Sequence, residues 1–358
     1  MIDLTSSLYL GLRHGSAVLP PWPQLTTGVP AVLAVAPEAG TVAAGLADLI
    51  GTKAATLAPS TLHAFWDLFV AMGARQIHVD AGTYPIGRWG AERARCRGAA
   101  VRTFRHHDPA ALRRAMAAGR GRGPVVLADG LCPGCGGVAP VGEYLAIARH
   151  FGGTVVVDDT QALGVLGTPA PGHPYGTGGG GTARWAGLGD ARLTIVASLA
   201  KGLGVPIAVV AGSRPMVRRY EARAETRVHC SPPSNAHLSA AAHALRCNTV
   251  RGDKLRKHLA HLVIGFRTLA DAHGVPVMPG LFPIQTVRPM AGVDLQEAHR
   301  RLGKLGVQAV LHQPRCGRGA ALSVIFTAAH READVERTVN AIGAALLGAA
   351  EGRLAVAG

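Results

Sequence analysis

Short apolar runs alternate with helical patterns through the first two thirds of the chain. Between residues 46 and 245, β-prone segments are separated by stretches whose apolar positions recur with helical spacing. These segments lie near 76–79, 101–104, 125–128, 154–157, 193–197 and 207–210. Such alternation predicts an α/β domain, with a mostly parallel sheet and helices on both faces.

The rest of the chain predicts two further parts. Residues 1–45 are expected to form an N-terminal arm packed on the smaller domain, and Pro20–Pro23 is expected to be a rigid, non-helical stretch within it. After the large domain (46–245), a long helix is expected over about 234–272. It leads into a small α+β domain within 246–358, with strands near 283–288, 309–312 and 322–326 and helices near 295–305 and 332–347.

The β-prone run at 154–157 ends in two carboxylates, Asp158 and Asp159. A buried strand of this kind in a parallel sheet ends at the edge where open α/β sheets bind ligands. A carboxylate there suits a protonated pyridine nitrogen, as pyridoxal phosphate chemistry requires. A helix cap, a metal ligand or a turn are the alternatives for the pair.

The segment 198–204 places Lys201, one of five lysines, between two apolar runs. Burial disfavours the ammonium form, and a neutral amine is what attacks an aldehyde to form a Schiff base. A solvent-facing lysine in a turn is the alternative. Together, Asp158 and Lys201 predict a pyridoxal phosphate site, with Lys201 as the cofactor anchor.

These motifs resemble the α-oxoamine synthase branch of the fold-type I pyridoxal phosphate enzymes, within aminotransferase class I/II. The resemblance rests on Asp158-Asp159-x-x-Ala-x-Gly, on Ser198-x-x-Lys201-Gly-x-Gly and on the closing run 327–335. Weaker matches spread it over most of the chain, at 9–12, 104–108, 129–140 and 231–233. It implies a large domain with a mostly parallel, seven-stranded sheet and a small α+β C-terminal domain.

The resemblance also implies roles for individual residues. Lys201 would hold pyridoxal 5'-phosphate and later move the substrate proton, while Asp158 would pair with the ring nitrogen. Ser198 would hydrogen-bond the phosphate. Ser60 and Thr61 stand where the family holds the phosphate at a helix N-terminus, whose unpaired amides favour an anion. Simple N-capping by these two residues is compatible with that role.

The chain also departs from the family. Tyr84 stands where the family stacks a histidine on the cofactor ring, and Gln161 where it has a histidine near the ring hydroxyl. Tyrosine can still stack, and glutamine can donate a hydrogen bond but cannot titrate. Ser323 falls near the place of the arginine that binds the substrate carboxylate. Arg315 and Arg318 are the candidates to replace it, and exposed loop arginines are the alternative.

The resemblance implies a transferase that forms an external aldimine with an amino acid or amine. Its α-carbanion would condense with an acyl thioester, and carbon dioxide would leave. The missing carboxylate arginine and the altered histidines keep an aminotransferase, or another carbanion reaction on an unusual amine, as the main alternative. A non-catalytic pyridoxal phosphate-binding regulator is the remote one. The glycine-rich segment that serves the family's acyl-CoA users is shortened here, between Leu12 and Gly51, which leaves acyl-CoA open as the second substrate. Active sites of this family are shared between two subunits, so a homodimer is expected, with Gly202–Gly204 and Ser231–Asn235 near the site.

Composition narrows the partners. The 358 residues carry a formal charge of +15, but 32 of the 37 basic residues are arginines spread along the chain. No nucleic-acid motif accompanies them, so no nucleic-acid partner is expected. The sequence has no uninterrupted apolar run of membrane-spanning length and no signal-like start. We therefore expect a cytoplasmic protein with small-molecule substrates.

Two remaining motifs have simpler explanations. Cys132 and Cys135 form the only CxxC pair, and the sixteen histidines show no metal-binding spacing, so no metal is assigned. The glycine-rich run 176–181 lacks the context of a phosphate-binding loop. It is expected to be a flexible surface loop.

Overall fold

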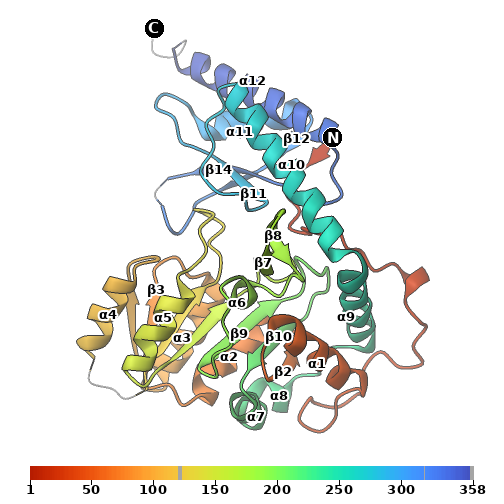
Figure 1. Ribbon diagram of the computed structural model, residues 1–358, viewed down its shortest axis with the longest axis vertical. Coiled ribbons are helices and arrows are strands. Elements are labelled where there is room, and N and C mark those ends of the chain that lie inside the picture. Colours follow the sequence, from red (N-terminus) through yellow and green to blue (C-terminus); the bar gives the residue numbers. More distant parts are fainter. Residues whose placement is uncertain (120–122, 318, 355–358) are drawn as a thin grey trace. The chain divides into compact units, whose positions relative to one another are not determined.

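The computed structural model describes residues 1–119, 123–317 and 319–354 (Figure 1). The chain divides into two compact units. The larger comprises residues 12–132 and 138–253. The smaller comprises residues 1–11, 133–137 and the chain from 254 onward.

A seven-stranded sheet is the centre of the larger unit, in the order β2-β10-β9-β6-β5-β3-β4 (Figure 1). Its strands are β2 (Ala54–Ala58), β3 (Gln76–Asp80), β4 (Ala100–Phe104), β5 (Val125–Asp129), β6 (Thr154–Asp158), β9 (Leu193–Ser198) and β10 (Ala208–Gly212). All run parallel except β10, which is antiparallel to both neighbours. The predicted, mostly parallel sheet is therefore confirmed.

Helices cover this sheet. They are α1 (Glu38–Ile50), α2 (Thr61–Ala71), α3 (Pro85–Cys96), α4 (Pro109–Ala117), α5 (Val141–His150), α6 (Thr182–Trp185), α7 (Arg214–Arg223), α8 (Glu225–His229) and α9 (Asn235–Cys247). Phe65 and Phe69 of α2 are fully buried in a core cluster with Ile77 and Val79 of β3. Several helices begin at a side-chain cap, in which Ser60, Asp108 or Ser234 accepts the amide three residues later.

The smaller unit is α+β. Strands β11 (Ile284–Val287), β14 (Ala321–Ile325) and β13 (Val310–His312) form an antiparallel sheet in that order. Strand β1 (Ile2–Asp3) pairs in parallel with β12 (Val307–Gln308). The helices are α10 (Asp253–Ala272), α11 (Leu295–Lys304) and α12 (Glu332–Leu354). The long helix predicted near 234–272 is present as α9, a π-helical turn (Asn248–Gly252) and α10.

The glycine-rich run 176–181 was expected to be a surface loop, and this expectation is wrong. Gly176 lies within β8 (His173–Thr177), which pairs with β7 (Thr168–Ala170). Gly180 forms a β-bridge with Leu163, and residues 179–181 are buried. Glycine is needed here because the chain passes too close to its neighbours for a side chain: a Cβ on Gly180 would lie 2.1 Å from the carbonyl oxygen of Leu49.

This packing predicts a large effect for Gly181→Ala. Gly181 has φ +84°, and a Cβ there would lie 1.9 Å from Asp159 Oδ2. We expect the substitution to lower the free energy of unfolding by about 3 kcal/mol, measured by denaturant unfolding. Gly178 has a similar φ of +83°, but a Cβ at that position would meet only open space, so Gly178→Ala should cost only about 1 kcal/mol of backbone strain. Equal losses in the two variants would contradict the clash with Asp159.

Among the described residues, none of the helices is long and apolar enough to cross a lipid bilayer.

Candidate active site

Four parallel strands of the larger unit end in polar residues at one edge of the sheet. Asp80, Asp129, Asp158 and Ser198 are the last residues of β3, β5, β6 and β9. The register places Asp129 directly beside Asp158. Because the carboxyl ends of parallel strands line ligand sites in open α/β sheets, this edge is the candidate active site.

Lys201 lies in the turn that joins β9 to β10. The turn is closed by Leu199, whose amide donates to Ile207 O at 2.8 Å and whose carbonyl accepts from the Val205 amide at 3.1 Å. Burial lowers the pKa of the Lys201 ammonium, although the carboxylates of Asp158 and Asp129 act in the opposite direction. Lys201 and Asp158 are therefore close enough for the charge of each to affect the pKa of the other.

Asp158 is 7% exposed. Burial raises the pKa of its carboxyl, while hydrogen bonds from Thr160 and the charge of Lys201 favour the ionised form. The Thr160 amide donates to Asp158 Oδ1 at 3.1 Å. Thr160 Oγ1 in turn accepts the Ser198 amide at 3.0 Å, so one threonine fixes both the carboxylate and the strand end that precedes Lys201.

Asp129 is a member of this site that the sequence analysis did not assign. Its two carboxylate oxygens accept the Tyr84 amide at 3.2 and 3.1 Å. Burial, followed by the neighbouring Asp158 charge, raises the pKa of Asp129 well above its usual value. Its position at the end of a β-prone run, like that of Asp158, is the signal that could have identified it.

Asp159 holds the start of α6 rather than the site around Lys201. It is fully buried, and its carboxylate accepts the Thr182 amide at 2.8 Å and the Thr182 hydroxyl. Burial raises the pKa of Asp159 to about 6. The two consecutive carboxylates therefore have different neighbours. Asp158 interacts with Lys201, and Asp159 binds Thr182 at the start of α6.

The N-terminus of α2 lies at the same edge of the sheet. Ala208 of β10 pairs with Ala58 of β2 on one side and with Ser198 on the other. Ser60, just beyond β2, caps α2: its Oγ accepts the His63 amide at 3.4 Å and lies 2.8 Å from His63 Nδ1. Thr61 is the first residue of the helix. With strands about 4.8 Å apart, Ser198 and Ala58 are separated by roughly two strand spacings, and the N-cap Ser60 follows Ala58 by two residues.

Tyr84 and Gln161 flank the site. Tyr84 precedes α3; its amide is held by Asp129, and its side chain is 55% exposed. Gln161 follows Thr160 in the turn after β6 and is half-buried.

A hydrogen-bonded cluster around Asp80 was not predicted. The Asp80 carboxylate accepts the amides of Gly82 (2.7 Å) and His107 (2.9 Å) and the Tyr144 hydroxyl (3.1 Å), and His106 Nδ1 lies 2.6 Å away. Burial alone would raise the pKa of Asp80, but these hydrogen bonds lower it. Asp80, His106 and His107 offer potential metal ligands within 4.8 Å of one another, yet the carboxylate is already surrounded by donors.

This cluster predicts a pH-dependent stability. Because the pKa of Asp80 is lowered in the folded protein, its contribution is present above the ordinary carboxyl value of 3.8 and is lost as the pH falls through the lowered pKa. Asp80→Asn should therefore cost about 3 kcal/mol near pH 7. Thermal unfolding should show the gap between wild type and variant narrowing as the pH drops below 3.8. A gap that stays constant down to pH 2 would contradict the ionised state of Asp80.

Three predicted substrate-binding residues belong to the smaller unit or lie outside the described chain. Ser323 is buried in β14, where its hydroxyl lies 2.8 Å from Thr286 Oγ1 and 2.8 Å from His312 Nε2. Arg315 is exposed beyond β13. Arg318 lies outside the described residues.

Comparisons with known proteins place this geometry in a family. No protein-family model matches the chain. The 8-amino-7-oxononanoate synthase of Alkalilimnicola ehrlichii is 33% identical over 257 residues, covering 71% of this chain and 63% of that protein. The synthase of Aromatoleum aromaticum is 33% identical over 248 residues, covering 68% and 61%. The matched region thus spans less than two thirds of the length of these relatives.

Solved structures show the same fold. Serine palmitoyltransferase from S. paucimobilis, with a bound PLP–myriocin aldimine, superposes with a TM-score of 0.84 at 18% identity, covering 97% of this chain and 88% of that one. The 8-amino-7-oxononanoate synthase of Francisella tularensis gives a TM-score of 0.74 at 17% identity, covering 96% and 97%. Together with the sequence relatives, they confirm the predicted fold class. The chain belongs to the α-oxoamine synthase branch of the fold-type I pyridoxal phosphate enzymes.

Proposed function

We propose that this protein is a pyridoxal phosphate-dependent transferase that condenses an amino acid with an acyl thioester, with loss of carbon dioxide. The observation that carries the proposal is the pairing of Lys201, whose pKa is lowered by burial, with the buried carboxylate of Asp158 at the ligand edge of the sheet. The relatives, which are 8-amino-7-oxononanoate synthases, favour condensation over transamination.

The residues present fit the cofactor. The Lys201 amine suits an aldehyde, because a lowered pKa leaves more of it neutral and nucleophilic. Hydrogen bonds from Thr160 reach the Asp158 carboxylate, and a carboxylate in this position suits a protonated ring nitrogen. Ser198 and the α2 amides behind Ser60 and Thr61 suit the phosphate. When bound, the cofactor supplies an electron sink for the substrate α-carbon.

Each residue then has a distinct task. Lys201 would hold the cofactor and, when the substrate amine takes its place, would move the proton at the α-carbon. Asp158, oriented by Thr160, would keep the ring nitrogen protonated. Tyr84 would stack on the ring, and Gln161 would donate to the ring hydroxyl.

The carboxylate of the amino substrate needs a donor other than the family arginine. Ser323 is committed to Thr286 and His312, which leaves it little capacity to bind a substrate. We assign the role to Arg315 or Arg318, whose guanidinium groups match a planar carboxylate.

We further propose that two copies of the chain share the site, with Gly202–Gly204 and Ser231–Asn235 near it. The expected mass in solution is twice the 36.9 kDa of one chain. Light scattering after size-exclusion chromatography measures it, and a single species of 36.9 kDa would contradict the proposal.

The test of function is an assay that separates condensation from transamination. Protein loaded with pyridoxal phosphate is incubated with a panel of amino acids, with and without acyl thioesters. Condensation predicts carbon dioxide and free thiol released in equal amounts, only when both substrates are present. Keto acid formed without thioester, together with conversion of the cofactor to its amine form, would favour the aminotransferase instead.

A further inference from the structure

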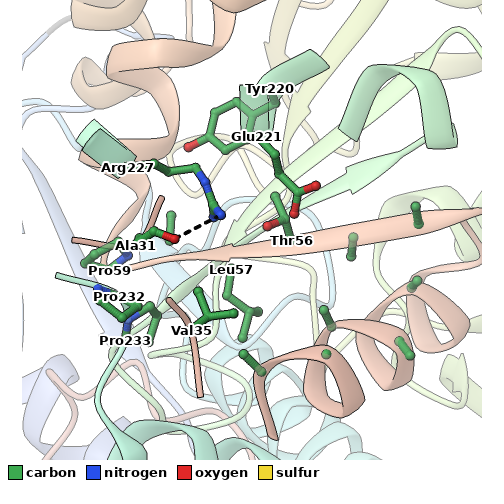
Figure 2. Close-up of a pocket in the computed structure, with 18 of the residues that line it drawn as sticks. Ala31, Val35, Thr56, Leu57, Pro59, Tyr220, Glu221, Arg227, Pro232 and Pro233 are labelled. Carbon is green, nitrogen blue, oxygen red and sulfur yellow. Dashed lines mark hydrogen bonds between the residues drawn. The ribbon is translucent and has the colours of Figure 1, made fainter. Parts of the chain in front are cut away.

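A cavity of about 450 Å³ lies beside β2 in the larger unit. Lys201, Asp158 and Ser198 do not line it, whereas Ser231, Pro232 and Pro233, from the segment proposed to lie near the shared site, do. β2 is an edge strand, because within the described chain it pairs in the sheet with β10 and no other strand. The wall formed by α1 and β2 consists mostly of small side chains, including Ala43, Ala47 and Ala55, with Leu57 beside them. These residues leave an apolar space of the size that holds small ligands (Figure 2).

Two polar groups that line this cavity lack partners. Arg227 Nη2 donates to the Ala31 carbonyl at 3.3 Å, but its Nε is buried without an acceptor, and it forms no ion pair with any described carboxylate. Tyr220 is 1% exposed, and its buried hydroxyl also has no hydrogen-bond partner in the described part of the chain. Figure 2 shows the Arg227 side chain between Tyr220 and Ala31, while the Glu221 carboxylate is turned toward Thr56.

An anion with oxygen acceptors would supply the hydrogen bonds that these two groups lack. Burying a guanidinium N–H and a hydroxyl without hydrogen bonds is unfavourable, and a carboxylate is the group that matches both donors. The charged side chains around the cavity add to this preference: Lys53, Arg214 and Arg227 outnumber Asp48 and Glu221.

We propose that this cavity binds a small amphipathic monocarboxylate, with its carboxylate at Arg227 and Tyr220 and its alkyl chain along the alanine wall of α1 and β2. Lys201 does not line this cavity, so binding of the carboxylate does not require the function proposed above.

Calorimetric titration of the cofactor-loaded protein with butanoate, hexanoate and octanoate tests this site. Binding should be saturable with one site per chain. Affinity should rise about fourfold with each added methylene until the cavity is filled, as expected for burial of a CH₂ group. Hexylamine has the same chain and the opposite charge, so it should not bind. Equal binding of hexanoate and hexylamine, or no binding of any acid, would overturn the proposal.

Substitutions test which residues bind the carboxylate and which contact the alkyl chain. Arg227→Met should weaken hexanoate binding about tenfold or more, as for a charged hydrogen bond, and Tyr220→Phe about fivefold. Ala43→Leu should narrow the cavity along α1 and weaken binding. The control is Arg223→Met, an exposed arginine of α7 that does not line the cavity, and thermal unfolding checks that each variant is folded. An effect of Arg223→Met as large as that of Arg227→Met would show general charge attraction and refute the site.

Lys201→Ala is expected to bind hexanoate with unchanged affinity. A loss of hexanoate binding in this variant would place the acid in the active site and refute the proposed cavity site. If instead only the condensation assay failed, the proposed function would be refuted but the hexanoate-binding result would stand.

Discussion

Replacing Lys201 with alanine is expected to lower kcat by at least about 10³-fold and to abolish the absorption band of covalently held cofactor. The variant loses the amine that anchors the cofactor and the group that moves the substrate proton, and general acid–base catalysis alone contributes about 10²- to 10⁴-fold. The fold should remain, because Lys201 lies in a turn closed by backbone hydrogen bonds of Leu199, Val205 and Ile207.

Chemical rescue distinguishes these roles from a structural one. A small primary amine such as methylamine, added to Lys201→Ala, should restore part of the activity in proportion to its concentration, because it can supply the missing base. Lys304→Ala is the matched control, since Lys304 is exposed at the end of α11 in the smaller unit; it should keep both band and activity. Full activity of Lys201→Ala without added amine would refute the proposed anchor.

The strands that carry the site were predictable from sequence because their composition is distinctive. The runs ending at Asp158 and Ser198 are rich in β-branched residues and almost entirely buried between helices. The edge strand β2 was missed because Ala54–Ala58 is mostly alanine, which has low β-propensity. It forms a strand through its pairing with β10, a contact that no local pattern reveals.

The parts of the site that escaped prediction depend on tertiary neighbours. Asp129 joins the site because the register sets it beside Asp158 and because the Tyr84 amide reaches it from 45 residues away. The Asp80 cluster gathers His106, His107 and Tyr144 from two later parts of the chain. The glycine run 176–181 was misread for the same reason: the residues that press on it, Leu49 and Asp159, are distant in sequence.

Asp158→Asn is expected to retain the cofactor but lower kcat by about 10²- to 10³-fold, the range seen when one charge-stabilising group is removed from an active site. The asparagine Oδ1 can still accept the Thr160 amide that Asp158 Oδ1 accepts at 3.1 Å, so the local geometry should persist. An amide carries no charge, so it cannot hold the proton on the ring nitrogen, and the ring withdraws electrons less strongly.

Asp129→Asn is the matched control for this variant. Asp129 lies beside Asp158 at the same edge, but burial and the Asp158 charge raise its pKa well above the usual value. An amide therefore resembles its protonated form, and kcat should change by less than about tenfold, which corresponds to about 1.4 kcal/mol. If Asp129→Asn lowered kcat as much as Asp158→Asn, the ring nitrogen would not depend specifically on Asp158. If instead Asp158→Asn kept wild-type kcat, Asp158 would not support the cofactor charge, and the proposed role of Asp158 beside Lys201 would be refuted.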